Sequence, residues 1–183
     1  MTPPRYGAFP IALHWLTALL VVAAFTLGPG GSETRVYSAA KDFDRNLHEA
    51  LGLTVFALTL LRLVWRAAGG AGPELEVPRW MAVASRSVQG ALYVLLLAVP
   101  LTAIFGAWLS GHPLTLGILG NIPPPVAESH AFGRQLAKVH EYLGDTILWV
   151  AGAHAAAALF HHFILRDTVL LSMLPRWRGR RAD

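Results

Sequence analysis

Four long apolar segments dominate the sequence. They run from about residue 9 to 28, 47 to 66, 83 to 109 and 136 to 165. Each meets the roughly 20 residues that a helix needs to cross about 30 Å of hydrocarbon. With 54% hydrophobic and 14% charged residues, the 183-residue chain is too apolar for an ordinary soluble domain of its size. The sequence therefore predicts an all-α fold: a single integral membrane four-helix bundle over residues 1–183.

The first segment and the basic residues set the expected orientation. The segment is longer than a signal-peptide core and lacks a clear small-x-small cleavage site before Glu33, so we expect it to be retained. With the N-terminus inside, ten of the 15 Lys and Arg residues fall on the inner side and five on the outer side. Both termini are therefore predicted to be cytoplasmic. The Arg176–Arg181 tail is expected to lie on anionic lipid and not on nucleic acid.

Four histidines lie inside these segments: His14, His48, His140 and His154. An imidazole in hydrocarbon is costly unless something holds it, so such residues are functional candidates. The 14 residues from His140 to His154 span about 21 Å and return to within about 40° of the same helix face. His48 opens the second segment at the depth of His140, and His14 lies at the depth of His154. The spacing predicts an outer pair and an inner pair.

Paired imidazoles on facing helices are the ligands of a six-coordinate haem. The chain has no cysteine, so a haem here would be non-covalent and b-type. Gly52 and Gly144 each follow an outer histidine by one turn and leave room for a flat macrocycle. We therefore expect two b-type haems that transfer electrons and bind no gas. The alternative is a haem-free protein in which each imidazole bonds a backbone carbonyl or a nearby hydroxyl.

Three further residues are candidates for the chemistry. Arg62, 14 residues after His48, is expected either to pair with a propionate of the inner haem or to reach the lipid interface. Lys138 is expected to serve the outer propionates or to be an ordinary loop charge, as are Arg134 and Arg45. His161 either hydrogen-bonds a quinone carbonyl and delivers a proton, or forms a solvated interfacial pair with His162.

At these residues the chain resembles the bacterial cytochrome b-561 family, four-helix di-haem membrane proteins that include superoxide oxidase. The resemblance is densest in the last third of the sequence, and His14-Trp15, Arg62 and Pro100 extend it over nearly the whole chain. Three stretches carry it: His140-Glu141-x-Leu143-Gly144, His154-Ala155-Ala156-Ala157-Ala158-Leu159-x-His161-His162, and Arg166-Asp167-x-x-Leu170-Leu171-x-Met173-Leu174-Pro175.

The resemblance implies a protein of the bacterial inner membrane that exchanges electrons with ubiquinone. It implies that the four histidines are haem ligands and that His161 lies near the quinone, which makes His161, Arg62 and Lys138 the candidate catalytic residues. A superoxide oxidase takes electrons from superoxide at the periplasmic face. The outer segments, with five basic and seven acidic residues, show no evident positive funnel for that anion. The alternative is an electron-transfer subunit that serves a partner dehydrogenase or hydrogenase.

Overall fold

The computed structural model describes residues 5–70, 72, 77–116 and 120–175. Its four long helices are α1 (Ala8–Leu27), α3 (Asp42–Ala67), α4 (Arg79–Leu109) and α5 (His130–Phe160). All four are long and apolar enough to cross a membrane. The fold is all-α apart from a short antiparallel pair, β1 (Leu114–Thr115) with β2 (Asn121–Ile122). The basic tail that the sequence places on lipid lies outside the described residues.

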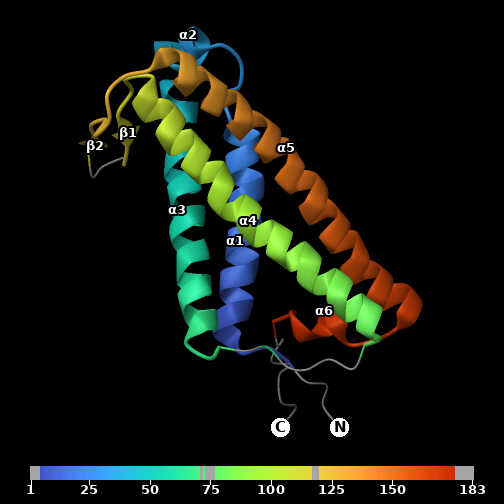
Figure 1. Ribbon diagram of the computed structural model, residues 1–183. Helices are drawn as coiled ribbons and strands as arrows, with labels where there is room; N and C mark the ends of the chain where they lie inside the picture. The colour runs from blue at the N-terminus through green and yellow to red at the C-terminus, as the bar shows by residue number, and fades with distance from the viewer. Residues whose placement is uncertain (1–4, 71, 73–76, 117–119, 176–183) are drawn as a thin grey trace, which may run out of the picture.

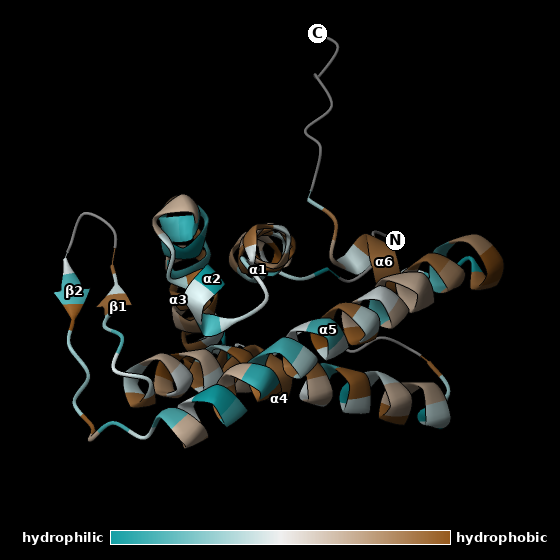
Figure 2. Cartoon of the chain, turned by 90° about the horizontal axis from the view of Figure 1, so that it is seen from above, coloured by the Kyte–Doolittle hydropathy of each residue, from teal (hydrophilic) through white to brown (hydrophobic). Residues whose placement is uncertain are grey.

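The helices pack as two pairs. α1 lies beside α3, and α4 crosses α5 (Figures 1 and 2). The α4–α5 crossing is tight near the His48–His140 pair, at the end of the bundle that we call the outer end, because Gly106 packs against α5 and Gly133 packs against Ser110. The end that carries His14 and His154 is called the inner end. Small residues allow such a close approach between membrane helices, where van der Waals packing drives association. The two pairs contact each other mainly through α3 and α4.

A small apolar core lies between the two pairs. It contains Val55 of α3, Leu95 and Leu96 of α4, and Ile147 of α5, with Leu20 of α1 packed against it. Ile147 is seven residues from both His140 and His154, so this core occupies the middle of the bundle. It separates the depth of the outer histidines from that of the inner ones.

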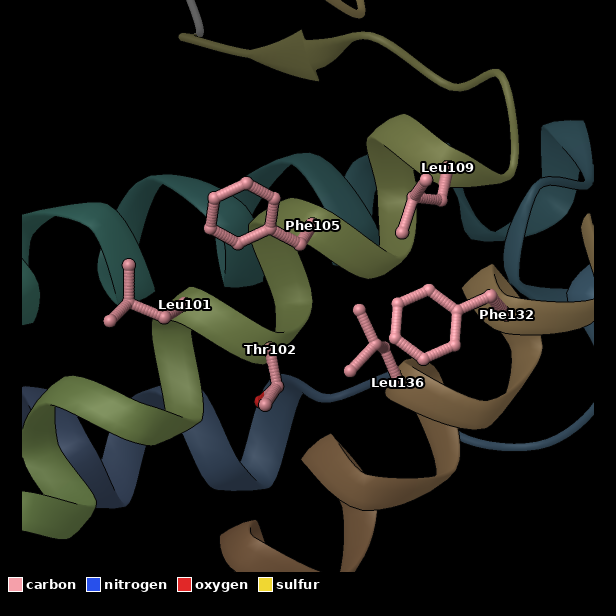
Figure 3. Close-up of a pocket in the computed structure, with 6 residues that line it drawn as sticks. All are labelled: Leu101, Thr102, Phe105, Leu109, Phe132 and Leu136. Carbon is pink, nitrogen blue, oxygen red and sulfur yellow. The ribbon is translucent and has the colours of Figure 1, made fainter. Parts of the chain in front are cut away.

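Most of the remaining apolar surface faces outward. Trp149 is 81% exposed and Leu19 is 67% exposed. A soluble monomer rarely leaves such an apolar surface in water, whereas lipid chains accommodate it. Between α4 and α5, an apolar hollow of about 170 Å³ lies on this surface, with Phe105 and Leu109 opposite Phe132 and Leu136 (Figure 3). None of the candidate site residues lines it.

Three helices begin earlier than the apolar pattern predicts. α3 starts at Asp42 instead of about residue 47, α4 at Arg79 instead of 83, and α5 at His130 instead of 136. Each extra turn carries at least one charged residue, so a pattern based on uninterrupted apolar length does not count it. In the first turn of α3, acids favour the helix N-terminus, and Lys41 bonds Asp44 at 2.8 Å. α1 matches the prediction to one residue at each end.

The connections at the outer end contain short elements. α2 (Glu33–Val36) and η1 (Ala39–Lys41) fill the first connection, which the sequence predicts to be a polar loop. At the inner end, η3 (His161–Leu165) is a π-helical turn, and α6 (Val169–Ser172) follows it. The Tyr6 N–H donates to the Ser172 carbonyl at 3.1 Å, and the Trp15 indole donates to the Met173 carbonyl at 2.8 Å. These bonds hold both described ends of the chain at the same end of the bundle.

Candidate haem-binding sites

The four histidines meet as two pairs. The rings of His48 and His140 have centroids 5.9 Å apart, and those of His14 and His154 are 6.3 Å apart. A bond from an imidazole nitrogen to a metal is about 2 Å long, so two rings with centroids roughly 6 Å apart leave room for one metal between them. The structure thus brings together the pairs expected from the sequence, at a separation that would suit one haem iron in each.

The outer pair is fixed in one tautomer by backbone carbonyls. The Nδ1 atom of His48 lies 2.7 Å from the Ala24 carbonyl oxygen of α1, and the Nδ1 atom of His140 lies 2.8 Å from the Val99 carbonyl oxygen of α4. Since a carbonyl only accepts, each Nδ1–H is the donor. The lone pair of each neutral ring is then on Nε2, free to bind a metal. The same bonds also fit the haem-free alternative, but they leave both Nε2 atoms without a role.

The glycines next to these histidines leave open space. A Cβ added at Gly52, Gly144 or Gly152 would meet no atom within 4 Å. Gly152 lines a surface hollow of about 410 Å³ together with Phe25, Asp145 and Trp149, and none of the four histidines lines it. In close-packed protein, the open space at Gly52 and Gly144, one turn from the outer imidazoles, suits a flat macrocycle. Among the described residues, no group of three or more His, Cys, Asp or Glu side chains would hold a bare metal ion.

Arg45 provides a free donor at the outer level. Its guanidinium donates to Glu49 at 2.9 Å and to Asp42 at 3.0 Å, while its Nε is buried and has no hydrogen-bond partner among the described residues. A buried donor without a partner is costly, and a propionate would satisfy it. Arg45 precedes His48 by three residues, so both lie on the same side of α3. The donors, the open space and the paired rings together fit a b-type haem.

Arg62 lies at the depth of the His14–His154 pair, as predicted from its spacing to His48. Its positive charge acts on both rings of the inner pair. The guanidinium carbon also stands 5.5 Å from the centre of the Tyr93 ring, close enough for a cation–π contact. This contact holds the Arg62 side chain against Tyr93 of α4.

Lys138 lies exposed on the outer part of α5, with its ammonium 5.8 Å from the centre of the Tyr142 ring. No interaction in the structure links it to the outer histidine pair. Lys41 and Arg45, which also lie at this end, bond acids. The exposed bases Arg134 and Lys138 therefore supply the positive charge on this side of α5.

The structure adds an outer network that the sequence did not indicate. The rings of Tyr37 and His112 stack with centroids 3.4 Å apart, and His112 bonds Glu33 at 3.1 Å. Burial and then the charge of Glu49 raise the pKa of Tyr37 to about 12. Glu49 also accepts from the Thr115 backbone N–H at 3.0 Å, which gives this acid a structural role. These contacts join three outer segments next to the His48–His140 pair.

His161 has a partner that sequence reasoning missed. Its Nδ1 lies 2.5 Å from the Oδ2 atom of Asp167, in the connection that follows η3. Asp167 belongs to the Arg166-Asp167 stretch of the family resemblance, but sequence reasoning assigns it no role. The signal available was an acid shortly after a histidine at a helix end. The inner end thus presents an imidazole held by a carboxylate, seven residues from His154.

A four-helix membrane bundle with two imidazole pairs at separate depths defines a membrane cytochrome. The chain matches the family described as prokaryotic cytochrome b561 over residues 5–176. It belongs to that family, which implies b-type haem. It is 32% identical over 181 residues to cytochrome b561 homolog 1 of Escherichia coli (strain K12), with 94% of this chain and 98% of the relative covered.

Two further relatives also align over almost their whole length. Cytochrome b561 homolog 2 of Escherichia coli (strain K12) is 28% identical over 174 residues, covering 94% of this chain and 93% of the relative. The probable superoxide oxidase CybB of Yersinia pestis is 28% identical over 178 residues, covering 96% of this chain and 98% of the relative.

Proposed function

We propose that the protein is a di-haem b-type oxidoreductase of the bacterial inner membrane that passes electrons between superoxide and ubiquinone. The observation that carries the proposal is the pair of imidazole sites, one toward each end of the bundle. The similarity to a probable superoxide oxidase supports the choice of substrates. Two b-type haems, when bound, would supply one-electron transfer across most of the bilayer thickness.

The four histidines would hold the two haems. His48 and His140 would hold the outer haem through Nε2, and His14 and His154 the inner one. Gly52 and Gly144 leave the space for the outer macrocycle. Arg45 Nε would bond a propionate of the outer haem, and the Arg62 guanidinium a propionate of the inner haem.

The outer end is the proposed entry for superoxide, and both termini are proposed to be cytoplasmic. This orientation is supported by the excess of basic residues on the inner segments and by the contacts that hold Tyr6 beside Ser172. Lys138 and Arg134 are the exposed bases of α5 that would attract an anion at the outer end. At the inner end, His161 is the proposed proton donor to a quinone carbonyl.

One observation favours the second candidate, an electron-transfer subunit that serves a partner dehydrogenase or hydrogenase. Lys41 and Arg45 are both neutralised by neighbouring acids, which weakens steering of a small anion. A carrier that receives electrons from a docked protein does not need such steering. It would exchange electrons with quinone but would not consume superoxide.

The ligand assignment is tested by two substitutions on the same helix. His140→Ala should lose the outer haem and His154→Ala the inner one, so each variant should bind about half the haem of the unmodified protein. Absorption spectra of the purified variants measure this ratio. Two haems in both variants would refute the assignment, and a colourless unmodified protein would refute haem binding altogether.

The substrate assignment requires a separate assay. The purified holoprotein is mixed with a superoxide source and a ubiquinone analogue, and superoxide consumption is followed with and without the quinone. Quinone-dependent consumption supports the proposal. Haem that is reduced by a quinol analogue without any superoxide consumption would favour the carrier instead.

A further inference from the structure

The inner end of α5 has an unusual backbone. The α-helix changes to the π-helical turn η3 at His161–Leu165, and Arg166 then takes a left-handed conformation with φ of 55°. This conformation is unfavourable for a residue other than glycine. π-turns and strained residues cluster at functional sites, where the surrounding structure holds them in place. Here the result is a reversal of the chain that returns Asp167 to His161.

Asp167 holds His161 through two contacts. The Nδ1–H of the ring donates to Oδ2 at 2.5 Å, and the Asp167 backbone N–H donates to the His161 carbonyl at 3.2 Å. The other carboxyl oxygen accepts from the Val169 N–H at 3.0 Å, at the start of α6. Partial burial raises the pKa of Asp167, but the hydrogen bonds from His161 and Val169 and the nearby imidazoles outweigh burial and lower it overall.

The contact determines which nitrogen of His161 is available. Because Nδ1 is bonded to the carboxylate, Nε2 is the atom that can exchange a proton. The His161 side chain is 17% exposed and that of Asp167 is 31% exposed, so the carboxylate is the more accessible of the two. His161 lies about 10 Å along the helix from His154, at the end of the membrane-spanning segment.

We propose that Asp167 is a positioning residue that holds His161 with Nε2 directed to a quinone carbonyl at the inner membrane interface. The inference rests on the proposed function and deepens it. Two superoxide ions each lose one electron and become dioxygen. Ubiquinone gains these two electrons and two protons and becomes ubiquinol. The protonated His161 ring transfers one proton from Nε2 to a carbonyl oxygen and regains a proton from water at the inner interface. The other carbonyl oxygen takes the second proton from the same water.

The test measures electron exchange between a short-chain ubiquinol and the holoprotein by the rate of haem reduction. Asp167→Asn keeps the size of the side chain but removes the charge, and it should slow the exchange by roughly tenfold or more, as loss of an orienting partner does. The quinol concentration for half-maximal rate should change less, because positioning acts on proton transfer. Haem content and reduction by dithionite should not change.

Two comparison variants separate positioning from a structural role. Asp167→Glu restores the carboxylate and should recover most of the rate. His162→Gln, a change at the adjacent imidazole, should leave the rate close to that of the unmodified protein. An unchanged rate in Asp167→Asn, or equal losses in Asp167→Asn and His162→Gln, would overturn the proposal.

A double variant covers the case in which Asp167→Asn binds less haem. Since Asp167 acts through His161, adding Asp167→Asn to His161→Gln should not lower the rate of haem reduction per bound haem any further. Additive losses of this rate would refute the coupling. The assay uses no superoxide. A protein that exchanges electrons with quinol but ignores superoxide would refute the proposed substrate and leave this inference intact.

Discussion

Two glycines on the same helix should respond in opposite ways to the same substitution. In the protein without cofactor, Gly144→Ala adds a methyl group to open space. Replacing a helix-interior glycine by alanine stabilises a protein by about 0.5–1 kcal/mol where nothing obstructs the new group. Gly144→Ala should therefore raise the unfolding free energy of the apoprotein by that amount.

Gly133→Ala should have the opposite effect. Its Cβ would lie 2.4 Å from the Ser110 Oγ and 2.9 Å from the Ser110 backbone nitrogen. The hydroxyl can rotate away, but the nitrogen is bonded to the Gly106 and Ala107 carbonyls, so α4 and α5 must separate. Overpacking of this kind costs about 1–3 kcal/mol, which exceeds the gain in helix propensity.

In haem binding the two variants should rank the other way, with Gly144→Ala the more damaging substitution. The methyl group of Gly144→Ala occupies space one turn after His140, where the macrocycle is proposed to lie. The outer haem should bind about tenfold more weakly, which corresponds to about 1.4 kcal/mol, and the larger Gly144→Leu should exclude it. Folded Gly133→Ala should keep both haems, because its methyl group points into the α4–α5 contact.

The assay combines denaturant unfolding of the apoproteins in detergent with the haem-to-protein ratio from absorption spectra. Gly144→Leu with two haems bound, or Gly144→Ala with an apoprotein as destabilised as that of Gly133→Ala, would show that the space beside His140 does not hold the cofactor. Either result would refute the argument from open glycines.

Three further predictions concern single charges. Arg62→Leu should make the midpoint potential of the inner haem more negative in a redox titration, because a positive charge favours the reduced form; an unchanged potential would mean that Arg62 only packs on Tyr93. Because the pKa of Asp167 is lower in the folded protein than its unfolded value of about 3.9, its ionised form stabilises the fold above that pH. This stability is lost as the pH falls through the folded pKa, so Asp167→Asn should remove part of the acid sensitivity of unfolding. Because folding raises the pKa of Tyr37 to about 12, the protein should lose stability as the pH rises above the unfolded value of about 10. Glu49→Gln should lower the pKa of Tyr37, as measured by phenolate absorbance, since it removes a like charge.

The sequence predicted the long helices and the histidine pairs because both depend on local spacing. Membrane helices are recognised by their apolar length, and 14 residues of helix place His140 and His154 on one face. The polar first turns of α3 and α5 were missed, since they extend beyond the hydrocarbon. They are helical because α3 begins with acids that favour its N-terminus and α5 with Gly133 packed on α4.

The parts that could not be predicted depend on contacts between distant residues or on single backbone angles. His112 and Glu33 are 79 residues apart in sequence, and nothing in either segment indicates the other. The carbonyl partner of His140 belongs to Val99, and a backbone acceptor has no sequence signal. The pairing of His161 with Asp167 depends on the left-handed conformation of Arg166, a residue type that does not favour it.

The distribution of ligands over the helices explains how the bundle fixes two sites at once. α5 carries one imidazole of each pair, so the rise of a single helix sets their separation of about 21 Å. The opposite imidazoles come from α1 and α3, which pack against each other, and His48 bonds the Ala24 carbonyl of α1 directly. The apolar core around Ile147 fills the layer between the two depths. A change in that core would alter the spacing of α5 from both neighbours, whereas a change at one histidine affects one depth only. The two proposed sites therefore have separate ligands, but the geometry of both depends on how the middle of α5 packs around Ile147.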